Sequence, residues 1–232
     1  MALSKENIDS LFKFTRAHFV EWYDLQIELV DHLADDIEAI MEKSPSISFD
    51  EAKNQAFKKF GVFGFSDVVE KKQNALSKKY WKLVLSITLE YFKLPKIVLT
   101  AFLIMICYTF LHAISFKAYF IYLVSGILLI SPIVIATLNR LKQKETEKET
   151  GKKWMFENNI STLGGIYLIS NFFIQTLIFI EDISWSIPTE IFTSIFIVLS
   201  LLLFYILIFI VPKKLRQEMA EQYSEYILVS KT

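Results

Sequence analysis

Residues 97–114 read IVLTAFLIMICYTFLHAI, a stretch that contains no Asp, Glu, Lys or Arg. A helix that spans a hydrocarbon core about 30 Å thick needs roughly 20 consecutive apolar residues. Three further runs of this kind follow, at residues 118–138, 162–180 and 191–211. The sequence therefore predicts four transmembrane helices in the second part of the chain.

Composition agrees with a membrane protein, because 53% of the residues are hydrophobic and the apolar excess lies after Pro95. The single cysteine, Cys107, falls within the first apolar run. A disulfide framework or a Cys/His metal cluster is therefore excluded. The first residues also lack the basic start and apolar core of a secretory signal, so we expect the N-terminus to stay in the cytoplasm.

The distribution of Lys and Arg predicts the orientation of the spans. Basic residues lie before the first span, between the second and third, and after the fourth, whereas Lys117 alone lies on the other side. By the positive-inside rule, both termini, the loop at 139–161 and the tail at 212–232 are cytoplasmic. We expect the protein in the inner membrane of a bacterium.

Residues 83–94 are apolar but include Glu90 and Lys93, and Pro95 follows directly. This pattern favours an amphipathic helix at the membrane interface, over residues 79–96. The alternative is a longer first span that starts near Leu83 and kinks at Pro95.

Residues 1–78 are predicted to form a small acidic helical domain. Residues 1–70 hold 7 Lys and Arg against 14 Asp and Glu, so a nucleic-acid partner, which needs a basic surface, is not expected. Helices are predicted over residues 5–18, with Ser4 as the N-cap, and over 21–43. A Ser48–Glu51 capping box starts a third helix, which Gly61 ends, and Ser66 starts a fourth. The expected fold class is thus all-α, a cytoplasmic helical domain followed by a four-helix transmembrane bundle.

The helix at 21–43 is strongly amphipathic. Its apolar side is formed by Trp22, Leu25, Leu29, Leu33, Ile37 and Ile40. The opposite side is polar and is formed by Asp24, Glu28, Asp31, Asp35 and Glu38.

Glu28, Asp31, His32 and Asp35 share one stripe of this helix, at spacings i, i+3, i+4 and i+7. Carboxylates and an imidazole on one stripe suit a divalent cation such as Mn²⁺ or Zn²⁺. No second helix supplies further ligands, so the favoured interpretation is a solvated acidic surface or a docking surface for a basic protein partner.

Gly164, Gly165, Asn171 and Gln175 make the most polar part of the predicted bundle. Asn171 and Gln175 share a face and could line a ligand path. Small and amide residues also pack helices against each other in membranes, and packing is the favoured interpretation. The same packing could join copies of the chain, or this chain and another, into an oligomer.

No phosphate-binding loop, zinc-protease motif or serine-hydrolase motif occurs in the chain. Glu90, Lys93, His112 and Glu157 are predicted near the interface but do not form a recognisable catalytic set. We therefore expect no enzymatic activity and no cofactor.

The stretch from Glu28 to Glu38, the Ser48-Phe-Asp-Glu-Ala52 motif and Lys59-Phe-Gly61 together resemble the HAAS-type helical domain, which precedes membrane segments in bacterial proteins. The resemblance covers about the first 75 residues, and it departs from the usual pattern at residues 62–65. It implies a non-catalytic signalling or adaptor domain with a cytoplasmic protein partner, in a group associated with PadR-type transcriptional regulators. The leading hypothesis is a membrane-anchored regulatory or adaptor protein, and the alternative is the membrane subunit of a transporter or permease.

Overall fold

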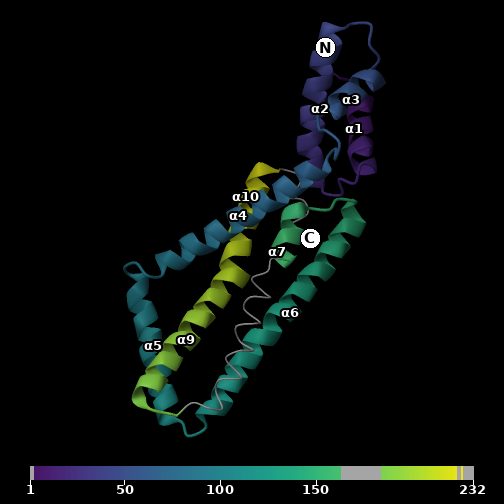
Figure 1. Ribbon diagram of the computed structural model, residues 1–232. Coiled ribbons are helices and arrows are strands. Elements are labelled where there is room, and N and C mark those ends of the chain that lie inside the picture. Colours follow the sequence, from purple (N-terminus) through teal and green to yellow (C-terminus); the bar gives the residue numbers. More distant parts are fainter. Residues whose placement is uncertain (1–2, 163–183, 224–225, 227–232) are drawn as a thin grey trace. The chain divides into compact units, whose positions relative to one another are not determined.

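The computed structural model describes residues 3–162, 184–223 and 226. Within these residues every regular element is a helix and there is no strand, so the described part is all-α as predicted (Figure 1). The elements are α1 (Lys5–Ala17), α2 (Tyr23–Lys43), α3 (Phe49–Lys58), α4 (Ser66–Glu90), α5 (Lys96–Ala113), α6 (Lys117–Thr150), α7 (Met155–Thr162), α9 (Ile187–Tyr205), the π-helix η2 (Ile206–Ile210) and α10 (Val211–Gln222).

The chain forms two compact units. The head unit comprises Met1–Ser77 and Gln143–Asn159, and the membrane unit comprises Lys78–Lys142 and Ile160–Thr232. Helices α4 and α6 each contribute residues to both units. The segment at 143–159, predicted as part of a loop between spans, thus belongs to the same unit as the N-terminal helices.

Local signals start and end the helices of the head unit. The Ser4 side chain accepts a hydrogen bond from the Asn7 N–H at the start of α1. The predicted capping box at α3 is present, because Ser48 and Glu51 each accept the other's backbone N–H. Gly61 has φ +77°, the left-handed geometry in which a residue without Cβ ends a helix at little cost.

The core of the head unit is built mainly by α2. Leu25, Leu29, Leu33 and Ile37 are at most 2% exposed and pack with Leu11 of α1. Each such side chain contributes about 1.5–3 kcal/mol through its removal from water. The rest of this core is formed by Val20, Val30, Ala52, Ala56, Phe65 and Met155.

One predicted polar residue of α2 is not solvated. Asp24 was predicted on the polar side, but it is 1% exposed. The prediction was wrong because helical periodicity identifies only which residues share a side of the helix. It does not show that the segment around Met155 covers the Asp24 carboxylate.

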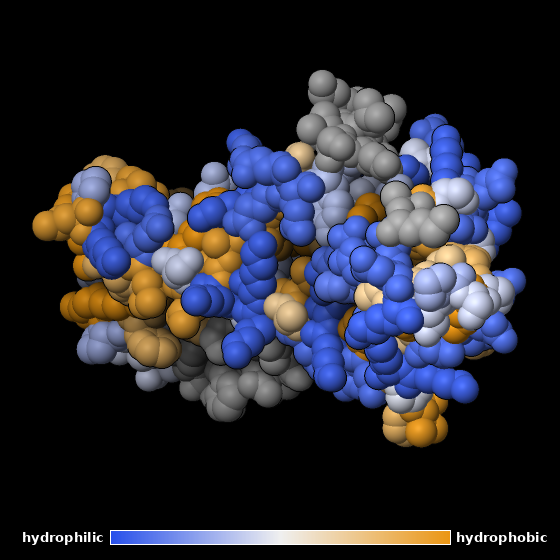
Figure 2. All heavy atoms as spheres, turned by 90° about the horizontal axis from the view of Figure 1, so that it is seen from above, coloured by the Kyte–Doolittle hydropathy of each residue, from blue (hydrophilic) through white to orange (hydrophobic). Residues whose placement is uncertain are grey.

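Three helices in the described residues are long and apolar enough to cross a membrane. They are Lys96–Ala113, Lys117–Thr150 and the continuous stretch Ile187–Gln222. Many of their large apolar side chains stay exposed, among them Phe102, Leu123 and Phe192, as expected where lipid replaces water. Figure 2 shows exposed hydrophobic residues in orange beside hydrophilic ones in blue. The predicted span at 162–180 lies outside the described residues apart from Thr162.

Within the membrane unit, α5 packs against α9. Ile121 of α6 and Ile197 of α9 share a cluster with Cys107 of α5. A second cluster joins the later part of α4 to η2 and the start of α10, through Tyr80, Val84, Ile87, Ile206, Leu207 and Val211. The membrane unit therefore has apolar packing of its own.

The region before the first membrane-length helix consists of the end of α4 and a short connection. Helix α4 runs unbroken from Ser66 to Glu90 and includes the boundary between the two units at Ser77 and Lys78. Turns occupy residues 91–95, and α5 then begins at Lys96.

Candidate functional site

The predicted acidic stripe on α2 remains a surface feature. Asp31, His32 and Asp35 are exposed, whereas Glu28 forms an ion pair with Lys72 of α4. Among the described residues no group of three or more His, Cys, Asp or Glu side chains is arranged to hold a metal ion. The stripe therefore presents separate polar side chains rather than a coordination site.

The N-terminal end of α2 is joined to the segment that follows α6. Asp24 Oδ1 accepts the backbone N–H of Met155 at 3.0 Å, and the Tyr23 N–H donates to the Lys153 carbonyl at 2.7 Å. Burial raises the pKa of the Asp24 carboxyl, and the hydrogen bond from Met155 offsets part of that effect. A buried carboxylate is thus used to hold a backbone amide from a distant part of the chain.

Side chains strengthen the same junction. Met155 is 1% exposed and belongs to the core of the head unit. The Trp154 ring meets Tyr23 edge to face, with centroids 5.5 Å apart, and Lys152 Nζ lies 4.2 Å from the centroid of the Tyr23 ring. Lys153 pairs with Glu21 at 2.6 Å. We call residues 152–156, with their contacts to residues 21–24, the α2 junction.

The α2 junction connects the head core to a membrane-length helix. α6 ends at Thr150, and residue 152 already belongs to the junction. Only four residues separate Thr150 at the end of α6 from Met155 in the head core, so the two are close along the chain. Sequence reasoning missed the junction, although the apolar triplet Trp154-Met155-Phe156 within a basic loop was a signal that some of this loop is buried.

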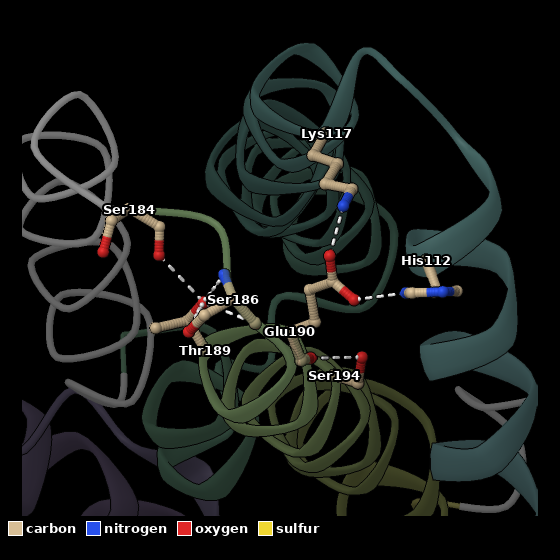
Figure 3. A network of polar contacts seen from close by, with 7 residues as sticks. All are labelled: His112, Lys117, Ser184, Ser186, Thr189, Glu190 and Ser194. Carbon is tan, nitrogen blue, oxygen red and sulfur yellow. Dashed lines mark hydrogen bonds and ion pairs between the residues drawn. The ribbon is translucent and has the colours of Figure 1, made fainter.

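A second group of polar residues lies within the membrane unit. Glu190 of α9 is 4% exposed and forms ion pairs with Lys117 of α6 and with His112 of α5 (Figure 3). His112 Nδ1 lies 2.8 Å from Glu190 Oε2, while Lys117 contacts the other carboxylate oxygen. Three membrane-length helices are therefore joined at one carboxylate, which we call the Glu190 cluster.

The local sequence positions Glu190 in the first turn of α9. Ser186 and Thr189 form a reciprocal cap at this helix start, and Ser194 Oγ donates to the Glu190 carbonyl at 2.7 Å. A carboxylate near a helix N-terminus is favoured by the free N–H groups there. Sequence reasoning missed the cluster because Glu190 was assigned to the connection before the span. The predicted topology itself offered a signal, since it places all three partners at the same side of the membrane.

The remaining candidates are separated or not described. Gly164, Gly165, Asn171 and Gln175 lie outside the described residues. Of the interfacial set, His112 pairs with Glu190 and Glu90 pairs with Lys96 at 2.9 Å. Glu157 lies in the head unit, where its carbonyl accepts from Gln143 Nε2 at 2.8 Å.

The described residues form an all-helical membrane protein that has a second compact unit. Residues 143–159, which lie between membrane-length helices in the sequence, belong to that second unit. Comparison with family models, with curated proteins and with solved structures found no match.

Proposed function

We propose that this chain is a regulatory or adaptor protein of the bacterial inner membrane, whose cytoplasmic head binds a protein partner. In this proposal four helices span the membrane, both termini are cytoplasmic, and the head reports on the membrane helices. The partner class suggested by the resemblance to HAAS-type domains is a PadR-type transcriptional regulator.

The observation that carries the proposal is the α2 junction. A head that served only as an appended domain would need no contact with chain between membrane helices. Here Met155 completes the head core and Asp24 holds its amide. A change in the membrane helices can therefore alter the helix that also carries the exposed acidic stripe.

Two features of the head suit a protein partner. The acidic stripe on α2 is available to a basic surface, and long-range attraction of this kind speeds association. Apolar side chains are also exposed at two connections, with Phe19 at 89%, Val62 at 98% and Phe63 at 72%. Exposed aromatic side chains outside the membrane are typical of protein interfaces.

The test is capture of a PadR-type regulator from the bacterium that encodes the chain, using the full chain as bait. One variant carries Asp31→Lys with Asp35→Lys, and a second carries Phe63→Ser. A control with the same charge change carries Glu6→Lys with Asp9→Lys, at exposed positions of α1 rather than α2. We expect both test variants to lose the regulator and the control to retain it. Equal capture by the parent and both test variants contradicts the proposal.

A transport role is the second candidate, and the Glu190 cluster is the observation that favours it. Ionisable residues within membrane helices commonly mark ion-coupled pathways. Proteoliposome flux measurements on Glu190→Gln, Asn171→Leu and Gln175→Leu decide this case. Flux that is absent in the parent, or unchanged in all three variants, counts against transport.

A further inference from the structure

The later part of α4, residues 78–90, has one buried side. Tyr80, Val84 and Ile87 are 4–5% exposed and pack against η2 and the start of α10. Burial raises the pKa of Tyr80 to about 12, which agrees with a side that excludes water. Lys79 also forms an ion pair with Glu218 of α10 at 2.7 Å.

A different side of the same residues is apolar and exposed. Trp81, Leu85 and Leu89, spaced four residues apart, are 38%, 60% and 51% exposed. Phe92 and Leu94, in the turns that follow α4, are also exposed, at 51% and 79%. Apolar residues four apart lie along one stripe of a helix, so the surface is continuous rather than scattered.

Basic side chains accompany this stripe. Lys78 and Lys82 are exposed at its beginning, and Lys93 is exposed near its end. Glu90 forms a direct ion pair with Lys96. This pair, with the positive charges of Lys214 and Lys93, holds the pKa of the Glu90 carboxyl below its usual range. Three cations thus gather around a single carboxylate, which leaves an excess of positive charge.

The position of the stripe in the chain identifies its surroundings. Lys96 is the first residue of α5, a helix long and apolar enough to cross the membrane. The apolar stripe therefore ends directly before a membrane-length helix. A helix with an apolar stripe flanked by lysines is the form of a helix that lies in the headgroup layer. Lysines next to a membrane span attract anionic lipid headgroups.

We propose that the exposed side of α4 from residue 78 onward, with residues 91–96 and the start of α10, forms a binding surface for anionic phospholipids. The apolar stripe enters the boundary between headgroups and acyl chains, and the lysines bind the phosphate groups of the lipids. This inference does not depend on a protein partner for the head. It makes α4 sensitive to the lipid composition of the cytoplasmic leaflet.

The first test measures lipid enrichment around the full chain in nanodiscs of phosphatidylcholine and phosphatidylglycerol, by mass spectrometry of the lipids that remain bound. The test variant carries Lys78→Gln, Lys82→Gln, Lys93→Gln and Lys214→Gln. The control loses the same charge in the head, through Lys5→Gln, Lys13→Gln, Lys43→Gln and Lys58→Gln, all at exposed positions.

We expect the parent and the control to enrich phosphatidylglycerol over its bulk fraction, and the test variant to lose this enrichment. Each lysine near the membrane surface changes the affinity for anionic lipid by about fivefold. No enrichment in the parent, or equal loss in the test variant and the control, overturns the proposal.

The second test concerns the apolar stripe and does not depend on charge. In a Cys107→Ser background, a polarity-sensitive fluorophore is attached at Leu85→Cys, and a matched label is attached at Glu70→Cys, an exposed position of α4 within the head unit. We expect emission from position 85 to shift to shorter wavelength and to be quenched by nitroxide-labelled lipids. Equal access of an aqueous quencher to both positions overturns the placement in the headgroup layer.

Discussion

Truncating Met155 tests how strongly the segment after α6 contributes to the head core. Met155 is 1% exposed and packs among the buried side chains of the head unit. Met→Ala changes at such sites cost about 2–5 kcal/mol, because they remove buried apolar contacts and leave a cavity. A loss of 2 kcal/mol corresponds to about a thirtyfold change in an opening equilibrium.

Hydrogen exchange of the α2 amides, measured by mass spectrometry on the full chain in micelles, reports this change. In Met155→Ala we expect the amides of Tyr23–Lys43 to exchange at least about thirtyfold faster than in the parent. Val62→Ala is the control, because Val62 is 98% exposed and its truncation opens no cavity. Unchanged α2 exchange in Met155→Ala would refute a core that includes the segment after α6.

Three further predictions concern single interactions. Asp24→Ala should destabilise the head by about 1–3 kcal/mol, because the buried Met155 N–H loses its acceptor. Asp24→Asn keeps that acceptor. Because burial raises the pKa of Asp24 in the folded state, the Asp24 contribution to stability falls as pH rises from the ordinary pKa near 3.8 through the raised one. In denaturant titrations across this pH range, the stability of the parent should therefore fall relative to that of Asp24→Asn. Glu190→Gln should lower Tm in micelles, because it leaves Lys117 without a counter-charge. Adding Lys117→Met should recover part of this loss. A further fall of Tm in the double variant argues against the ion pair. Ser48→Ala should cost about 1 kcal/mol in chemical denaturation, and no measurable change contradicts the role of the cap.

Features encoded by neighbouring residues could be predicted from the sequence. The reciprocal cap of Ser48 and Glu51 needs only three residues of spacing, and the left-handed geometry of Gly61 needs only the lack of a Cβ. The apolar runs that correspond to α5, α6 and α9 are equally local signals. The alternation of apolar and polar residues along α2 likewise predicted its buried leucines.

Features encoded by distant residues could not be predicted in the same way. The burial of Asp24 depends on Met155, 131 positions later in the chain, and helical periodicity contains no information about that partner. The Glu190 cluster likewise needs three helices, and each of its members on its own is typical of a helix end.

The core of the head is completed by Met155, in the segment that follows a membrane-length helix. A zero-length carbodiimide cross-link tests it without any substitution, because Lys153 Nζ lies 2.6 Å from Glu21 Oε2. Lys59 and Asp36, also 2.6 Å apart, provide the internal control within the head. In membranes that contain the full chain, we predict cross-linked peptides for both pairs by mass spectrometry. Recovery of the Lys59–Asp36 link without the Lys153–Glu21 link contradicts the claim.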